Sequence, residues 1–318
     1  MPELRLGTPK VAAMELAASL ILSRKCWDHL NIVSVKLLRH SRMQFVFANL
    51  SCSFMLMTEA TKNKIVVRDL YKSFDGVTVL NGINLEVKAG EILTLIGPSG
   101  AGKTLTLKCI LGLIKPDSGS ILLDGKEVSD MPEKDRMEFF RKFGILFQRS
   151  GLFDGLRVWE NIGFRLNQQP GAKKQDVKAM AIKKLRSVGL SADVADLFQA
   201  ELSGGMQKRV GFARAIAGDP PILFLDEPTA GLDPIMSNVI NDQIFNNVRE
   251  LGSTVMAITS NLLTARIISD RIAMLHEGRV VWTGDVREAG HTDNPYVSQF
   301  WNKRKDGPIQ MSVSTVSA

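Results

Sequence analysis

Short hydrophobic runs separated by Gly, Asn and Asp residues dominate the chain from residue 65 to residue 147. Short apolar runs bounded by such turn residues are typical of β-strands. Two of the separating turns are Asn81-Gly82 and Asp124-Gly125. The pattern predicts strands over residues 65–68, 78–80, 84–87, 92–96, 120–123 and 145–147.

Between residues 132 and 217 the apolar spacing changes to the period of amphipathic helices. It predicts helices over 133–142, 174–188 and 206–217. Strands return at 222–225, 254–258, 271–275 and 279–282, with a helix over 236–251. The chain is therefore predicted to be an α/β protein with a helical insert. No internal repeat is visible, which predicts one such domain rather than two.

Both ends of the chain differ from this core. Residues 1–57 show neither period, and Met57 lies directly before the first strand, so we interpret them as an appendage. A targeting segment, a disordered arm and upstream sequence from an early start codon are the three interpretations, and we favour the last. The domain is expected over 58–301, followed by a polar tail over 302–318 that we expect to be disordered.

Charge and cysteine content narrow the function classes. The net charge is +7, but residues 1–57 hold seven Lys/Arg against three acidic residues and so supply +4, which leaves +3 for the rest. Cys26, Cys52 and Cys109 are widely spaced, which disfavours a disulfide framework or a zinc site and fits a reducing cytosol. The best apolar run, 45–57, is shorter than the roughly 18 residues that cross a bilayer, so we expect no span.

Residues 97–104 match a loop that binds phosphate groups. The loop follows the apolar strand 92–96 and precedes an apolar helix over 105–111, which is the context that this motif requires. Its glycines let backbone N–H groups surround phosphate oxygens, and the helix N-terminus adds a positive dipole end. We expect Lys103 to bind the β- and γ-phosphates and Thr104 to offer its hydroxyl to Mg²⁺. The predicted binding residues are Gly97, Pro98, Ser99, Gly100, Ala101, Gly102, Lys103 and Thr104.

Two adjacent carboxylates, Asp226 and Glu227, follow the wholly apolar strand 222–225. Acidic side chains at the end of a buried strand are costly unless a cation or a reaction uses them. Successive strand residues point to opposite sides, so we expect the two acids to differ in role. We interpret Asp226 as holding Mg²⁺ through water and Glu227 as polarising the attacking water.

A second glycine-rich helix start lies at residues 202–207, where Ser203, Gly204 and Gly205 make another anion-binding N-terminus. This stretch resembles the signature motif of ABC ATPases, and the resemblance covers residues 65–301. It implies a P-loop NTPase fold with an antiparallel β subdomain and an inserted helical subdomain at about 132–217. It also implies that two copies bind ATP head to tail, with the signature of one copy at the γ-phosphate held by the other.

Three further residues match ABC family positions. Gln148 matches the Q-loop glutamine that senses Mg²⁺ and water, and Phe74 matches the aromatic residue that stacks on adenine. Asp233 matches the D-loop residue that faces the second copy. The resemblance implies ATP and Mg²⁺ as cofactors, with Thr104, Gln148 and Asp226 around the metal.

One position departs from the family pattern. After the strand 254–258 the family has a His that hydrogen-bonds the γ-phosphate, whereas this chain has Ser260. The four histidines, His29, His40, His276 and His291, all lie elsewhere. Because serine is shorter and uncharged, its contact should be weaker, and loss of one such contact costs a few kcal/mol of transition-state stabilisation. We expect ATP binding to survive and hydrolysis to be slow unless water or a partner fills the gap.

Within the ABC family the chain resembles the ATPases of Mce-type lipid transporters, the phospholipid and outer-membrane lipid-asymmetry group, through the runs 147–161, 205–211, 226–231 and 294–300. This implies a peripheral subunit on the cytosolic face of a bacterial inner membrane, paired beneath a separate permease that works with a lipid-binding Mce-type subunit. Leu152, Phe153 and Trp159 are expected to be exposed apolar anchors for a permease helix. A chloroplast relative stays an alternative if residues 1–57 are a transit peptide.

Two other functions stay open. A non-transport ABC protein of translation or DNA repair would be favoured by paired domains, zinc cysteines or long coiled-coil arms, and the sequence contains none of these. A regulatory subunit with little hydrolysis is suggested by Ser260. The low charge outside residues 1–57 predicts no nucleic-acid partner. Cargo and direction of transport do not follow from this chain, because the permease and its partners set both.

Ser260→His is expected to raise the steady-state ATPase rate, because an imidazole would restore the γ-phosphate contact that the family uses. The rate at saturating ATP is the measurement, with ATP affinity as the control. An unchanged rate would show that this position does not limit hydrolysis.

Overall fold

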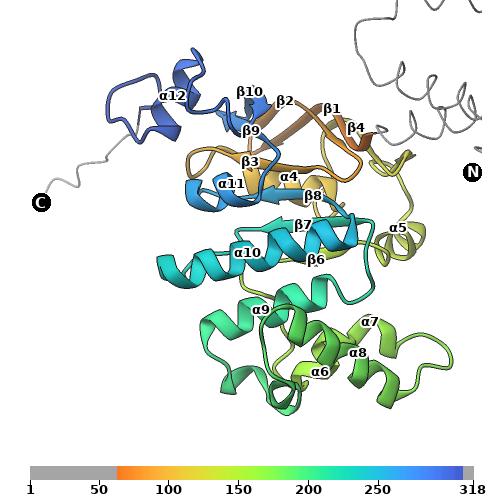
Figure 1. Ribbon diagram of the computed structural model, residues 1–318. Helices are drawn as coiled ribbons and strands as arrows, with labels where there is room; N and C mark the ends of the chain where they lie inside the picture. Colours follow the sequence, from red (N-terminus) through yellow and green to blue (C-terminus); the bar gives the residue numbers. More distant parts are fainter. Residues whose placement is uncertain (1–62, 311–318) are drawn as a thin grey trace, which may run out of the picture. The chain divides into compact units, whose positions relative to one another are not determined.

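The computed structural model describes residues 63–310. The predicted appendage at 1–57 and the end of the chain at 311–318 lie outside the described residues. Two sheets organise the described part (Figure 1). One has four strands in the order β2-β1-β4-β5, and the other has six in the order β10-β9-β3-β8-β7-β6.

The smaller sheet is antiparallel and contains β1 (Asn63–Phe74), β2 (Val77–Lys88), β4 (Ser118–Leu123) and β5 (Lys126–Glu127). The turn predicted at Asn81-Gly82 is wrong, because both residues lie inside β2. Gly82, with φ 75°, is instead the extra residue of a β-bulge opposite Leu70 and Tyr71. The turn predicted at Asp124-Gly125 is confirmed between β4 and β5.

The larger sheet is parallel apart from its edge strand β10. It contains β3 (Ile92–Ile96), β6 (Gly144–Leu146), β7 (Ile222–Asp226), β8 (Thr254–Ile258), β9 (Arg271–His276) and β10 (Arg279–Asp285). Every residue of β3, β7 and β8 is buried, as expected for parallel strands covered on both faces. The carboxyl ends of β3, β6, β7 and β8 lie at one edge, where open α/β sheets bind ligands.

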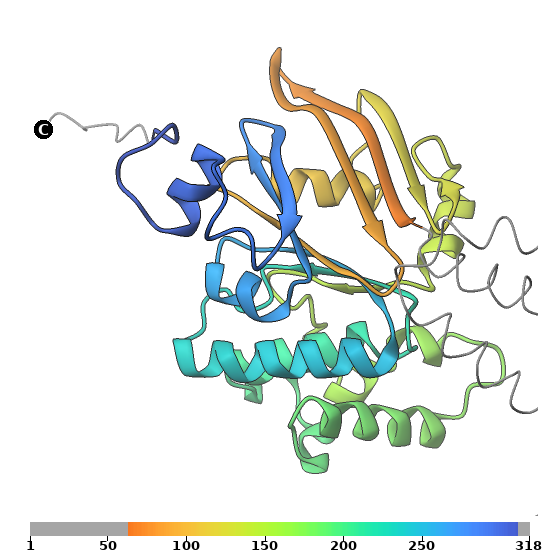
Figure 2. The same cartoon turned by 45° about the horizontal axis from the view of Figure 1, so that its top comes forward.

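Helices cover both faces of the parallel sheet. α4 (Lys103–Ile110) lies between the two sheets, where Leu107 packs in one cluster with Leu85 of β2 and Phe224 of β7 (Figure 2). α10 (Pro234–Leu251) covers the opposite face through apolar residues at a helical spacing, Ile240, Ile244 and Val248. α11 (Leu262–Ile268) and α12 (Pro295–Trp301) follow β8 and β10. None of the helices within residues 63–310 is long and apolar enough to cross a membrane.

The helical insert is shorter than the predicted span of about 132–217. α5 (Glu133–Phe140) packs through Phe139 into the core cluster of α4, and β6 is a strand of the parallel sheet. The insert contains α6 (Val158–Ile162), α7 (Phe164–Asn167), α8 (Lys174–Ser187), η1 (Ala192–Asp196), η2 (Gln199–Glu201) and α9 (Gly204–Ala215), and its α-helices lie in the lower part of Figure 1. α9 joins the insert to the sheet, because it packs against α6, α8, α10 and β6.

The polar segment after α12 is ordered where the structure describes it. Ile309 is buried and packs in one cluster with Trp301 and Leu262. The side chain of Gln299 accepts from the backbone N–H of Ile309 at 2.7 Å and donates to its carbonyl oxygen at 3.1 Å. The prediction of disorder from Asn302 onward is therefore wrong for 302–310, because the apolar side chain of Ile309 packs this segment against Trp301 and Leu262.

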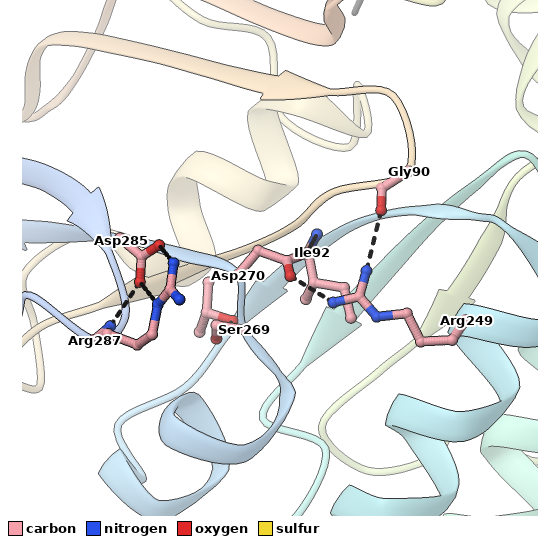
Figure 3. A network of polar contacts seen from close by, with 8 residues as sticks. Gly90, Ile92, Arg249, Ser269, Asp270, Asp285 and Arg287 are labelled. Carbon is pink, nitrogen blue, oxygen red and sulfur yellow. Dashed lines mark hydrogen bonds and ion pairs between the residues drawn. The ribbon is translucent and has the colours of Figure 1, made fainter. Parts of the chain in front are cut away.

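Asp270 secures the end of the parallel sheet opposite the ligand edge (Figure 3). Its Oδ2 accepts from the backbone N–H of Ile92, the first residue of β3, at 2.8 Å. Its Oδ1 pairs with Arg249 near the end of α10 at 2.5 Å. One carboxylate thus links β3, α10 and the start of β9 and supports the strand that carries the phosphate loop.

Asp270→Ala should lower the free energy of unfolding by about 1–3 kcal/mol, because the N–H of Ile92 loses its acceptor and Arg249 loses its carboxylate partner and keeps only the carbonyl oxygen of Gly90. Asp285→Ala is the matched control, since within residues 63–310 the Asp285 side chain pairs only with the nearby, exposed Arg287 (Figure 3). Urea unfolding of both variants measures the difference. Equal losses would contradict the role given to Asp270.

Candidate nucleotide-binding site

The loop at 97–104 connects β3 to α4 through a turn that only glycine can form. Gly97 has φ 149° and Gly102 has φ 103°. A Cβ added at Gly97 would lie 2.1 Å from the carbonyl oxygen of Leu275, and one added at Gly102 would lie 2.8 Å from the Leu80 side chain. The backbone conformation therefore favours glycine at both positions, and at Gly97 the fixed backbone oxygen of Leu275 also leaves no space for a Cβ.

Lys103, the first residue of α4, is buried and points its ammonium back into the loop. Nζ donates to the carbonyl oxygens of Gly97 at 2.8 Å and Pro98 at 2.9 Å. Burial lowers the pKa of Lys103, and the negative charges of Glu227 and Asp226 partly offset this effect. The structure thus brings the predicted lysine and the predicted acid pair into one electrostatic environment.

Asp226 ends β7 and is 6% exposed, with an Oδ1 that has no hydrogen-bond partner among the described residues. Burial raises the pKa of Asp226, and the neighbouring charge of Glu227 raises it further. A buried carboxylate oxygen without a donor is costly unless a cation binds it, and oxygen is the ligand that Mg²⁺ prefers. Together with the hydroxyl of the half-buried Thr104, this oxygen fits a Mg²⁺ ligand set.

Glu227 lies just beyond β7 with φ 45°, a left-handed conformation that non-glycine residues rarely adopt and that clusters at active sites. Its backbone N–H donates to the carbonyl oxygen of Ile258 at the end of β8, at 2.9 Å. The alternation of strand side chains therefore stops at Asp226. The side chain of Glu227 therefore differs in direction from that of Asp226 because of the left-handed backbone conformation at Glu227, not because of strand alternation.

Thr259 and Ser260 hold the Glu227 carboxylate by three hydrogen bonds. Thr259 Oγ1 donates to Oε2 at 3.0 Å. The backbone N–H and the hydroxyl of Ser260 donate to Oε1 at 2.8 and 2.9 Å. Sequence reasoning placed Ser260 opposite the γ-phosphate, which stays a prediction, and it did not anticipate Thr259. The structure adds that Ser260 restrains the predicted water-polarising group.

Lys208 is a further residue that sequence reasoning missed. It lies on α9, is 7% exposed, and its Nζ donates to the carbonyl oxygens of Gln148 and Glu227. One signal was present: Lys208 shares the buried stripe of α9 with Gly211, Phe212 and Ala215 at helical spacing. A lysine on an apolar stripe indicates a buried partner.

Most of the other predicted residues are exposed. Ser203 caps α9 by accepting from the N–H of Met206 at 3.3 Å, with Gly204 and Gly205 as the first helical residues. The side chains of Gln148 and Asp233 face outward, and Phe74 is 46% exposed. Asp233 caps α10 by accepting from the N–H of Met236 at 2.9 Å. Within residues 63–310 no hydrogen bond joins Ser203 or Asp233 to the phosphate loop.

The apolar anchors expected beside Gln148 are only partly correct. Trp159 is wrong as an exposed anchor, since it is 9% exposed and packs in the core between the insert and the sheet. Leu152 is partly buried against the same core. Phe153 is 46% exposed, and its ring lies 4.6 Å from that of Phe164, centroid to centroid. A cavity of about 300 Å³ opens here, lined by Ile145, Phe147, Gly151, Phe153, Ile162, Phe164, Arg165 and Arg214.

Comparison with known proteins identifies the family to which this chain belongs. Residues 80–230 match the family model described as ABC transporter. The probable ribonucleotide transport ATP-binding protein mkl of Mycobacterium leprae is 37% identical over 248 residues, which cover 78% of this chain and 71% of that protein. The chain belongs to the ABC transporter family. It is an ATP-binding subunit of a transport system, and ATP with Mg²⁺ is the cofactor pair of this family.

Two other relatives have different names. The chloroplastic protein trigalactosyldiacylglycerol 3 of Arabidopsis thaliana is 36% identical over 262 residues, covering 77% of this chain and 75% of that protein. The methionine import ATP-binding protein MetN of Caulobacter vibrioides is 40% identical over 226 residues, covering 70% of this chain and 68% of that protein.

A solved structure supports the fold. The dimeric post-hydrolysis state of the ATP-binding cassette MJ0796, bound to ADP and Pi, aligns with TM-score 0.65 at 30% identity and covers 70% of this chain and 99% of that one. The predicted P-loop NTPase fold of the ABC type is therefore confirmed. A dimer of cassettes and a membrane permease are the partners expected for the family.

Gly97→Ala is expected to weaken ATP binding at least about tenfold, because its Cβ would displace the loop from the carbonyl of Leu275. Gly90→Ala is the control: Gly90 also has a positive φ, 71°, but nothing lies within 4 Å of its added Cβ. Titration with a fluorescent ATP analogue measures both, with thermal unfolding to confirm that each variant folds. Wild-type affinity in Gly97→Ala would contradict the steric argument.

Proposed function

We propose that this chain is the ATP-hydrolysing subunit of an ABC transporter that moves lipids through a separate permease. The observation that carries the hydrolytic part is the Glu227 carboxylate, held by Thr259 and Ser260 beside the buried Asp226. A carboxylate so restrained is suited to orient and polarise water at a fixed place. Catalysis of phosphoryl transfer rests largely on such positioning.

The other residues of the edge bind and orient the nucleotide in this proposal. The backbone of 97–102 surrounds the phosphates, and Lys103 leaves its loop carbonyls to neutralise the β- and γ-phosphates. Asp226, Thr104 and Gln148 hold Mg²⁺, which when bound offsets the charge on the phosphate oxygens. Phe74, exposed at the end of β1, offers its ring to adenine.

A second copy of the chain completes the site. Ser203, Gly204 and Gly205 form an exposed helix N-terminus whose N–H groups suit an anion supplied from outside the subunit. Asp233, exposed at the start of α10, faces the same partner in this proposal. The dimeric relative bound to ADP and Pi supports the arrangement.

The cavity beside Phe153 is the proposed contact with the permease. It lies next to the backbone of residues 150 and 151, whose carbonyl oxygens Arg214 holds at 2.7 and 2.5 Å. An apolar permease helix seated on Phe153 and Phe164 would therefore press directly on the segment that follows Gln148. We place the subunit at the cytosolic face of a bacterial inner membrane, where the permease exposes that helix.

Lipid as the cargo rests on two observations. The runs 147–161, 205–211, 226–231 and 294–300 resemble Mce-type transporter ATPases, so a lipid-binding Mce-type subunit is the further partner we propose. The Arabidopsis relative carries the name of a galactolipid. Other relatives are named for ribonucleotide transport and methionine import, which makes these the competing cargoes.

Reconstitution with the permease should give ATP-dependent movement of fluorescent phospholipid between membranes. Glu227→Gln, which keeps the side-chain shape but removes the charge, should abolish both hydrolysis and movement while ATP still binds. Phe153→Asp should keep ATP binding in the isolated subunit and lose movement, because its charge would be buried against the permease helix.

Each arm of this experiment can contradict a different part of the proposal. Transport of a ribonucleotide or of methionine in place of lipid would overturn the cargo. Retained hydrolysis in Glu227→Gln would overturn the role of that carboxylate. Very slow wild-type hydrolysis would favour the regulatory subunit that Ser260 suggests.

A further inference from the structure

Lys208 is a buried cation that contacts several parts of the site; it lies in the run 205–211, but none of the nucleotide motifs gives it a role. It follows the Ser203 helix start on α9. Its ammonium donates to the carbonyl oxygen of Gln148, beyond β6, and to that of Glu227, beyond β7, the latter at 3.3 Å. One side chain therefore connects the helix that begins at Ser203 to the backbone of two residues proposed to act on ATP.

The surroundings of Lys208 make this bridge costly and specific. Lys208 is buried, at 7% exposed, and yet it forms no direct ion pair within residues 63–310. Burial lowers the pKa of Lys208, while the charges of Asp226 and Glu227 partly restore it. A buried ammonium without a directly bonded carboxylate is unfavourable unless its donors find acceptors, and here backbone carbonyls are the acceptors.

Close packing brings α9 against the same segments that Lys208 contacts. One turn along α9, a Cβ added at Gly211 would lie 3.0 Å from the side chain of Ser150 and 3.1 Å from that of Leu146. The helix thus lies almost against β6 and the segment that follows Gln148.

We propose that Lys208 is a positioning residue that holds the backbones of Gln148 and Glu227 in a fixed relation to α9, the helix that begins after Ser203. The inference rests on the roles given to those residues under the proposed function. When the N-terminus of α9 meets the nucleotide of the second copy, this ammonium links the position of that helix to the carboxylate that acts on water. It also links the helix to the segment on which the permease would press.

Three substitutions separate this role from ordinary packing. Lys208→Met keeps most of the stem and removes the charge and donors, Lys208→Arg keeps both, and Lys208→Gln keeps an amide donor. Lys184→Met is the matched control, because the side chain of Lys184, on α8, is also largely buried, at 12% exposed, but pairs directly with the carboxylate of Asp219. The measurements are kcat and KM of the permease-bound ATPase, the Kd of a fluorescent ATP analogue and the melting temperature.

Lys208→Met should lower kcat about 10- to 100-fold, as loss of an orienting contact typically does, while the Kd for ATP changes less than about threefold. Lys208→Arg should restore most of kcat, and Lys184→Met should leave it unchanged. If Lys208→Met does not fold, Lys208→Gln replaces it, with an intermediate kcat expected.

An unchanged kcat in a folded Lys208→Met or Lys208→Gln variant would overturn the inference. So would a parallel loss of kcat, ATP affinity and melting temperature that Lys208→Arg does not relieve, because that pattern indicates packing alone. Glu227→Gln in the same assay keeps the two proposals apart: if it stays active, the proposed function fails first. If it is inactive while Lys208→Met is fully active, only the role of Lys208 fails.

Discussion

Buried charges of opposite sign meet at the carboxyl edge of the parallel sheet, and the site depends on their balance. Lys103 and Lys208 approach this edge from two helices, and Asp226 and Glu227 approach it from the strand between them. Burial lowers the pKa of both lysines and raises that of Asp226. The carboxylates partly offset this effect at the lysines, and the lysines partly offset it at Asp226, whereas Glu227 raises the pKa of Asp226 further. The lysines bond to loop carbonyls rather than to carboxylates. The hydrogen bonds that satisfy the buried ammonium groups therefore also fix the backbone of the loops.

The fold was largely predictable because its strongest signals are local. Short runs that are apolar except for one Thr, such as 92–96 and 254–258, favour buried strands by their length and β-branched content, and they appear with those bounds. The errors came where a tertiary contact overrides local propensity. Glycine at position 82 is typical of a turn, but here it forms a β-bulge inside β2. Residues 302–310 are mostly polar, but the buried side chain of Ile309 packs this segment against the core. The sequence predicts Trp159 as an exposed anchor, but Trp159 is buried because it packs against helices that are distant in the sequence.

The site divides in the same way. The phosphate loop and the acid pair follow from spacing, because glycine positions and strand-end carboxylates are visible in the sequence itself. Thr259 and Lys208 were missed because their partners are single atoms on other segments. The carboxylate that Thr259 contacts and the carbonyls that Lys208 contacts become neighbours only when β6, β7 and β8 align. A sequence motif does not record which backbone carbonyl turns toward a lysine.

Ser260 shows how one departure from a family pattern can act in two directions. A histidine there could reach the γ-phosphate, and its absence argues for slow hydrolysis. The serine hydroxyl, however, donates to Glu227, and the backbone N–H of the same residue donates to the same oxygen. The backbone bond does not use the side chain, so every substitution except proline keeps this part of the restraint on Glu227. A serine at position 260 therefore positions the Glu227 carboxylate better, whereas a histidine would bind the γ-phosphate better. The hydrolysis rate reflects the sum of the two effects.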